Sequence, residues 1–308
     1  MDEKKLETKR IIIFLAFTFI LTIGYSVLLI YPSLNGGDLT NGATSTSMLL
    51  VSLVMFFPSL GVLFTRLVTK EGFQNAWIHP HLKGNIKIYL LGYFGPGILT
   101  LLGAAVYFLV FSDNFDKNCG YMQAALEAAG TSTDIYPVPL STLMIIQAVQ
   151  ALLLGPILNC ITCFGEEWGW RGYLLPKMSK KLSPISMLFV NGIIWGLWHA
   201  PLTVIGHNYG VGYLGFPFTG IAAMCGFCIV MGIFLSYVAM KTKSCLPAVL
   251  AHGSINSIAA IGLYFTKDGG NPFIGPAPTG IVGAIPFIIV DILICIFYFR
   301  KLETVEEK

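Results

Sequence analysis

The chain has 308 residues, of which 55% are hydrophobic and only 11% are charged. A soluble domain carries about 25% charged residues, so this composition excludes an ordinary soluble domain and indicates a polytopic membrane protein. The net charge is only +3, and no basic stretch resembles a nucleic-acid-binding face, so a nucleic-acid partner is not expected.

Apolar runs of about 20 residues are long enough to cross a bilayer as helices. They predict an all-α fold with about eight transmembrane helices in a single integral membrane domain, 1–308. The runs are 11–30, 48–68, 87–111, 140–176, 184–205, 217–239, 246–265 and 280–299. The first run is too long for the apolar part of a signal peptide, so we expect it to be retained. Ser183 is a candidate N-cap for the fifth.

The fourth run, 140–176, is too long for one straight helix. Gly155 and Pro156 form a natural kink, because proline removes a backbone donor and clashes with the preceding turn. We therefore expect a partly external or interfacial helix at 140–154 and a membrane span at about 157–178.

The basic residues divide unequally between the two sets of loops. Sixteen fall in one set and only Lys117 and Lys267 in the other, while Arg171 lies inside a span. Because cytoplasmic loops are enriched in lysine and arginine, both termini are predicted to be cytoplasmic and the acidic loop 112–139 external.

Few polar residues lie inside the spans, and four of them fall at a similar depth. Glu166 lies fourteen residues before Lys180, and His199 sixteen residues after Ser183, which places both roughly 21–24 Å from their shared cytoplasmic turn. His252 and Asn256 lie roughly 14–20 Å deep by the same count and share one helix face. The four side chains are therefore predicted to converge on one layer of the membrane.

Two of the charged residues nearby have an obvious partner in each other. Glu167 and Arg171 are spaced i, i+4, the favoured arrangement for a helical ion pair, which leaves Glu166 without an intrahelical cation. An unpaired carboxyl group in an apolar cavity is a candidate general base.

The remaining polar residues complete the outline of a hydrolase. His199 would share the proton of Glu166 and help to position water, while His252 and Asn256 can donate hydrogen bonds to a developing oxyanion. His79, His81 and His207 lie in loops and are expected to be solvated. Asn159, Asn191 and Asp291 are interpreted as interhelical contacts. The seven cysteines do not form a disulfide framework and are interpreted as packing residues.

Three motifs in order resemble those of one protein family. Residues Glu166–Arg171 (EEWGWR) match EExxxR, Trp195–His199 (WGLWH) matches an FxxxH-type motif with tryptophan for phenylalanine, and His252–Asn256 (HGSIN) matches HxxxN. Over about residues 140–260 the chain resembles the CPBP, or Abi, family of CAAX proteases and bacteriocin-processing enzymes. This family includes the type II CAAX prenyl endopeptidases and lysostaphin-resistance-A-like proteins.

The resemblance implies an eight-helix intramembrane glutamic endopeptidase. By correspondence with the family's motifs, Glu166 and His199 activate water, and His252 and Asn256 form the oxyanion hole. Glu167 and Arg171 support the site, and Trp195 keeps a large aromatic side chain where the family has phenylalanine.

The resemblance also suggests where the protein works and on what. Eukaryotic relatives act on prenylated C-terminal peptides, and prokaryotic relatives are linked to bacteriocin maturation, immunity and peptide signals. We therefore expect a multi-pass protein of a prokaryotic cell membrane whose partners are membrane lipids and a peptide or lipidated-protein substrate.

Alternatives remain open at this point. The side chains of Glu166, Glu167, His199 and His252 could bind Zn²⁺, but the sequence has no HExxH motif and amides such as that of Asn256 rarely bind zinc, so we favour a site without a cofactor. The chain could also be a transporter whose carboxylates relay protons, although no inverted repeat is evident, or a non-catalytic immunity protein.

Overall fold

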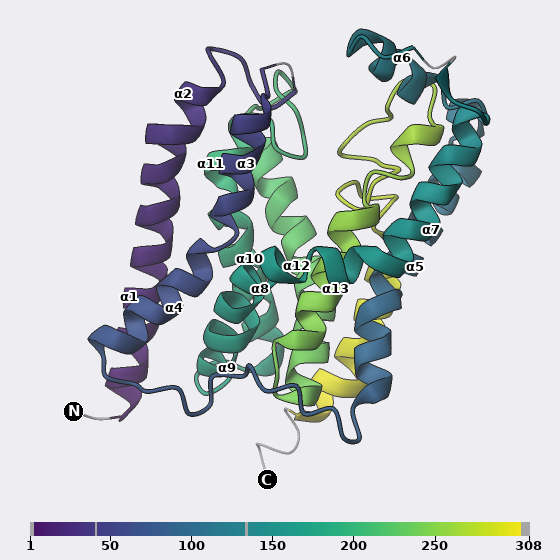
Figure 1. Ribbon diagram of the computed structural model, residues 1–308. Coiled ribbons are helices and arrows are strands. Elements are labelled where there is room, and N and C mark those ends of the chain that lie inside the picture. Colours follow the sequence, from purple (N-terminus) through teal and green to yellow (C-terminus); the bar gives the residue numbers. More distant parts are fainter. Residues whose placement is uncertain (1–2, 41, 133–134, 303–308) are drawn as a thin grey trace.

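The computed structural model describes residues 3–40, 42–132 and 135–302, and this part of the chain is a bundle of helices (Figure 1). The described residues contain no β-strand, only two isolated bridges, so the predicted all-α fold is confirmed. In chain order the helices are α1 (Glu3–Tyr25), η1 (Ser26–Ile30), α2 (Tyr31–Ser33), α3 (Ser45–Val54), α4 (Phe57–Val68), α5 (Ile86–Val110), η2 (Ser112–Asn114), α6 (Gly120–Ala128), α7 (Leu140–Leu158), α8 (Cys160–Gly169), η4 (Trp170–Leu174), α9 (Leu175–Met178), α10 (Pro184–Trp198), α11 (Ala200–Thr203), α12 (Phe218–Thr242), α13 (Leu246–Ile258), η5 (Leu263–Phe265), α14 (Ile285–Ile294) and η6 (Cys295–Phe299).

Six helical segments of the described chain are long and apolar enough to cross a membrane, so the protein is an integral membrane protein. They are Lys4–Ser33, Ser45–Val68, Ile86–Val110, Leu140–Leu158, Phe218–Thr242 and Leu246–Phe265. The other two predicted runs contain shorter helices: the apolar α10 has 15 residues, and α14 with η6 forms the last run.

The predicted break in the fourth run lies in a different place. Helix α7 continues through Pro156 to Leu158, and the chain leaves regular helix at Asn159, where φ is −89° and ψ is −3°. The side-chain amide of Asn159 donates to the carbonyl oxygen of Gly155 at 2.9 Å. The boundary predicted at residue 154 was therefore wrong by a few residues, because the helix accommodates Pro156 and continues to Leu158.

Helix α10, which carries His199 at its end, packs closely on α12. A Cβ atom added to Gly192 would lie 2.6 Å from Cα of Ile229, and one added to Gly196 would lie 2.4 Å from Cα of Cys225. Only glycine allows the two backbones to approach so closely. Ser183 caps the start of α10 by accepting from the backbone N–H of Ser186, as the sequence predicted.

The charged loops gather at opposite ends of the bundle. The start of α1 and helix α9 lie at one end, and α2 and α6 lie at the other (Figure 1). We call the first the basic end, formed by the helix termini and loops at residues 4–10, 66–87, 177–183, 241–245 and 300–302. We call the second the acidic end, which carries Asp38, Asp113, Asp116, Glu127 and Asp268 with Lys117 and Lys267.

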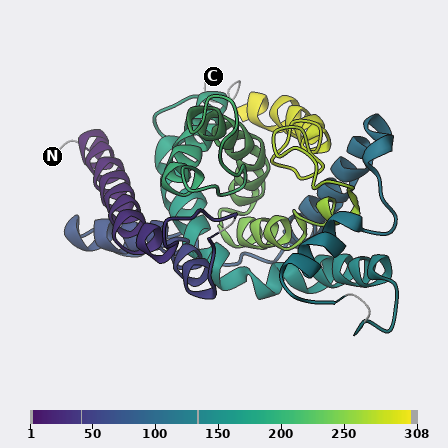
Figure 2. The same ribbon diagram turned by 90° about the horizontal axis from the view of Figure 1, so that it is seen from above.

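Ion pairs join separate segments at the basic end. Lys177 Nζ lies 2.8 Å from Glu7 Oε2 and also contacts Glu71, and Arg10 Nε lies 3.5 Å from Glu71 Oε2. Seen from the acidic end, α1 lies at one edge of the bundle and α5 and α7 at the other, with α10, α12 and α13 between them (Figure 2). This central group of helices holds the site described next.

Candidate active site

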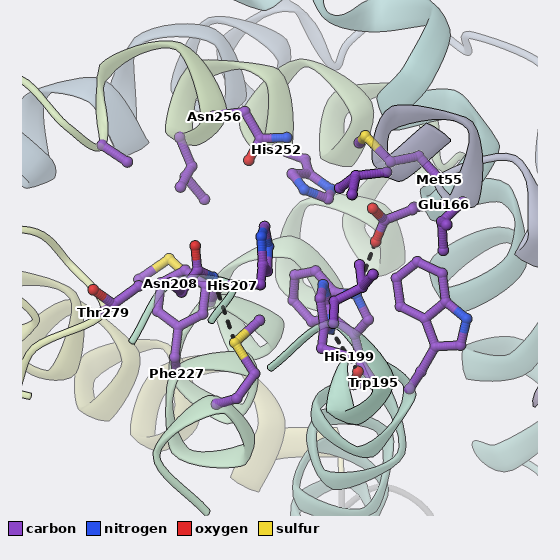
Figure 3. Close-up of a pocket in the computed structure, with 18 of the residues that line it drawn as sticks. Met55, Glu166, Trp195, His199, His207, Asn208, Phe227, His252, Asn256 and Thr279 are labelled. Atoms are coloured by element: carbon purple, nitrogen blue, oxygen red, sulfur yellow. Dashed lines mark hydrogen bonds between the residues drawn. The ribbon is translucent and has the colours of Figure 1, made fainter. Parts of the chain in front are cut away.

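A cavity of about 410 Å³ lies among α3, α8, α10, α12 and α13 (Figure 3). Its wall includes the four residues predicted to converge: Glu166, His199, His252 and Asn256. The first three are buried, with 3%, 8% and 6% of their surfaces exposed, whereas Asn256 is exposed. The fold therefore brings a carboxyl group, two imidazoles and an amide to one enclosed space.

Glu166 lies on α8 with its carboxylate at the cavity wall. Its Oε2 atom accepts a hydrogen bond of 2.9 Å from the indole Nε1 of Trp195 (Figure 3). None of the ion pairs found among the described residues involves Glu166. A buried carboxylate without a cation partner is free to accept a proton from a bound molecule.

Glu167, the next residue, is fully buried and does not line the cavity. Its Oε1 atom accepts from Arg171 Nη1 at 3.1 Å and from His252 Nδ1 at 2.8 Å. The pair with Arg171 is the one that the spacing predicts. The bond to His252 was missed, because it joins α8 to α13 and no spacing within one helix reveals it.

His199 is oriented by its own helix. Its Nδ1 atom lies 2.9 Å from the carbonyl oxygen of Trp195, and since a carbonyl oxygen only accepts, this nitrogen carries a proton. In the neutral ring the other nitrogen, Nε2, then has a lone pair with which to bind water.

Trp195 contacts four other residues of the site, Glu166, Arg171, His199 and His252. Besides its bonds to Glu166 and His199, its ring lies under the guanidinium of Arg171, with Cζ 4.1 Å from the ring centroid. Its edge meets the ring of His252 at a centroid distance of 5.5 Å. The sequence predicted only a bulky aromatic here. The signal that could have identified the hydrogen bond is the tryptophan itself, because phenylalanine has no N–H group.

His207 does not lie in open solvent as the sequence suggested. It lines the cavity, and its ring is parallel to that of His199, with centroids 6.2 Å apart and 4° between the planes. The loop after α11 turns back, with the N–H of His207 bonded to the carbonyl oxygen of Leu202, which carries the ring inward. Burial lowers the pKa of His207 to about 4, so the ring is uncharged at neutral pH.

Apolar side chains form most of the remaining wall. Four of them are methionines: Met48 on α3, Met55 at the C-cap of that helix, and Met224 and Met231 on α12. Methionine is unbranched and polarizable, so such a wall can adapt to apolar groups of different shape.

The four residues of the zinc alternative do not fit a metal ion. Among the described residues, no three histidine, cysteine, aspartate or glutamate side chains are placed to hold one. Glu167 is turned from the cavity toward Arg171 and His252, and the same bond occupies Nδ1 of His252.

The other three polar residues singled out in the spans, Asn159, Asn191 and Asp291, lie outside the cavity. Asn191 makes the predicted interhelical contact, donating to the carbonyl oxygen of Trp170 at 3.4 Å. Asp291 is buried on α14, and neither of its carboxylate oxygens has a hydrogen-bond partner among the described residues. The contact expected for Asp291 is therefore absent, and we have no physical account of this residue.

The motif-bearing segment is similar to a family of membrane proteases. Residues 148–258 match the family model described as type II CAAX prenyl endopeptidase Rce1-like, so the resemblance predicted from the three motifs is confirmed over this segment, which contains Glu166, Glu167, Arg171, His199, His252 and Asn256. A curated relative, CAAX prenyl protease 2 of Methanococcus maripaludis, is 30% identical over 93 residues. The match covers 30% of this chain and about a third, 34%, of the relative.

Proposed function

We propose that this chain is an intramembrane endopeptidase that hydrolyses a peptide bond with water activated by Glu166. The observation that carries the proposal is the convergence of Glu166, His199, His252 and Asn256 on one cavity. The match of the same segment to type II CAAX prenyl endopeptidases supports it.

The positions of the proton donors and acceptors support the following reaction. The Glu166 carboxylate takes a proton from water while Nε2 of His199 holds the water by a hydrogen bond, and the water oxygen attacks the scissile carbonyl carbon. The negative charge that develops on the carbonyl oxygen is stabilised by hydrogen-bond donors on α13. Glu166 then returns the proton to the nitrogen of the leaving amine as the C–N bond breaks.

His252 and Asn256 are the proposed oxyanion donors. The amide Nδ2 of Asn256 is held beside Cys163, 3.7 Å from its Sγ. Nδ1 of His252 donates to Glu167, and in the imidazolium form Nε2 of the same ring donates as well. Glu167 and Arg171 therefore act as positioning residues that fix the His252 ring.

We propose that the reaction needs no metal ion. The arrangement of the donor atoms supports this, because Glu167 and Nδ1 of His252 are bonded to each other and do not face the cavity together. The proposed substrate is a peptide or a prenylated or otherwise lipophilic protein. The name of the archaeal relative, a CAAX prenyl protease, and the methionine-rich wall support an apolar substrate.

The first prediction is that Glu166→Gln abolishes cleavage while the protein still accumulates in the membrane. Glutamine keeps the size of the side chain and can accept from Trp195, but it cannot take a proton from water. The measurement is mass spectrometry of new peptide termini in membranes from cells that produce either form. Glu127→Gln is the control, because Glu127 is an exposed carboxylate on α6 bonded only to Gln123.

We expect peptide termini that are present with the wild type and with Glu127→Gln but missing with Glu166→Gln. Identical termini in all three samples would contradict the proposal and favour a transport or immunity role. A synthetic peptide spanning one of the mapped sites is then cleaved by purified wild type with and without EDTA. Loss of activity with EDTA, restored by Zn²⁺, would contradict the metal-free reaction.

A further inference from the structure

One member of the proposed site, His199, lies toward the acidic end of the bundle. His199 follows the whole length of α10, whose 15 residues rise about 22 Å from their start at the basic end. Beyond His199 only the four residues of α11 precede the loop of the acidic end. Asn256 lies near the middle of its span, Leu246–Phe265, and only three residues before the C-cap of α13 at Ala259. The reacting groups therefore extend from the middle of the bundle toward the acidic end.

The cavity also opens in that direction. Asn208, in the loop at residues 204–217, is an exposed residue of its lining, and Met48, at the start of α3, is 52% exposed. Asn208 and Thr279 are shared with a second pocket of about 260 Å³. That pocket lies among loops of the acidic end, and its wall includes Asp268 and Tyr121.

The distribution of charge orients the molecule in the membrane. Lysines and arginines of five separate segments gather at the basic end, where Lys177 joins α9 to α1 and to the loop after α4. The acidic end has more carboxylates than cations. Because positively charged loops stay on the cytoplasmic side, the basic end is cytoplasmic and the acidic end faces the other side.

We propose that the substrate reaches Glu166 from the non-cytoplasmic side of the membrane. The inference rests on the proposed peptidase function and names its substrate class: an exported peptide, or an externally exposed segment of a membrane protein, cleaved near the outer boundary of the bilayer. In the bound substrate the scissile bond lies beside Glu166. The polar part of the substrate extends out of the cavity past Asn208 and Thr279 toward Asp268. A peptide confined to the cytoplasm would meet the basic end, roughly 22 Å of helix away from His199.

The test of the orientation is labelling of single added cysteines in living cells with a membrane-impermeant maleimide. Asn208→Cys reports on the mouth of the cavity and Asn118→Cys on the acidic end. Lys83→Cys is the matched probe at the basic end, and all three original side chains are exposed. The unsubstituted chain, whose seven cysteines are buried or only partly exposed, gives the background.

We expect Asn208→Cys and Asn118→Cys to be labelled equally in intact and in permeabilised cells. Lys83→Cys is expected to be labelled only after permeabilisation. Labelling of Lys83→Cys in intact cells, with Asn208→Cys protected, would overturn the proposal. The labelling needs no catalytic activity, so it decides the orientation even if the protein proves not to be a protease.

The second arm locates the cleaved bonds. Peptide termini that depend on Glu166 are expected to lie in exported peptides or in external segments of membrane proteins. Termini that depend on Glu166 but lie at cytoplasmic C-termini would confirm the peptidase and overturn the proposed side of entry. An absence of such termini would instead count against the peptidase function itself.

Discussion

At the scale of single residues, Trp195 is the side chain that organises the site. It donates to Glu166 through its indole, accepts from His199 through its carbonyl oxygen and lies against Arg171. The carbonyl bond would be present with any residue at this position, but the indole bond requires tryptophan. This chain therefore fixes the orientation of its proposed base with a donor that phenylalanine lacks.

We predict that Trp195→Phe lowers kcat with little change in KM. A hydrogen bond to a charged group contributes about 1.5–3 kcal/mol, so the loss of a correctly oriented carboxylate should reduce the rate roughly 10- to 100-fold. The measurement is steady-state cleavage of the mapped peptide by purified protein.

Trp170→Phe provides the matched control for that substitution. Trp170 is equally buried, but its indole nitrogen has no hydrogen-bond partner among the described residues. Equal loss of kcat in Trp170→Phe and Trp195→Phe would show that the effect comes from packing and not from the bond to Glu166.

The sequence predicted the site well where its signals lie within one helix. The i, i+4 spacing predicted the Glu167–Arg171 pair, and the count of residues from the helix ends predicted that the four side chains of the cavity lie at a similar depth. The bonds from His252 to Glu167 and from Trp195 to Glu166 cross between helices. Their geometry depends on the rotation of each helix about its axis, which the sequence pattern does not determine. His207 was misplaced for a related reason, since the path of a loop is not periodic.

At the scale of helices, the contact between α10 and α12 positions His199. Gly192 and Gly196 form a small-residue stripe along α10, and each faces the backbone of α12. The stripe replaces the usual layer of side chains between two helices with direct backbone contact. The end of α10 is thereby held against α12. There Sγ of Cys228 lies 3.9 Å from Nδ1 of His199.

We predict that Gly196→Ala lowers the thermal unfolding midpoint in detergent. The added Cβ atom would lie 2.4 Å from Cα of Cys225, so the helices must separate, and overpacking of this kind costs about 1–3 kcal/mol. Gly226→Ala on α12 is the control, because nothing lies within 4 Å of the added atom. Unchanged midpoints for both variants would refute the close contact.

Helix boundaries were predicted with uneven success. The serine cap at Ser183 is a local hydrogen-bond pattern and can be recognised from sequence. The break after Leu158 was displaced from the predicted position at Gly155, because Pro156 lies inside α7 and does not end it. About eight spans were predicted from apolar length, and six segments reach that length as helices.

At the scale of the whole molecule, an ion cluster ties distant segments together at the basic end. Lys177 contacts both Glu7 and Glu71, and Tyr173 donates to Glu71 at 2.8 Å. These residues lie on α1, on the loop after α4 and on the segment from η4 to α9. The charge pattern predicted that such residues share one side of the membrane, but it could not predict that they pair.

We predict that Lys177→Met destabilises the protein by about 1–3 kcal/mol, because it leaves two largely buried carboxylates with one cation fewer. The measurement is the thermal unfolding midpoint in detergent. Lys87→Met, an exposed lysine at the same end, should leave the midpoint unchanged. Equal midpoints for the two variants would show that the cluster contributes nothing measurable.

The methionine-rich wall has a chemical consequence of its own. Oxidants convert the thioether of methionine to a sulfoxide, which is polar and chiral. Met48 is 52% exposed at the mouth, and Met55, Met224 and Met231 lie farther along the same lining. Each added oxygen would make part of this apolar surface polar. The thioether groups that suit the wall to varied apolar substrates therefore also make it vulnerable to oxidative damage.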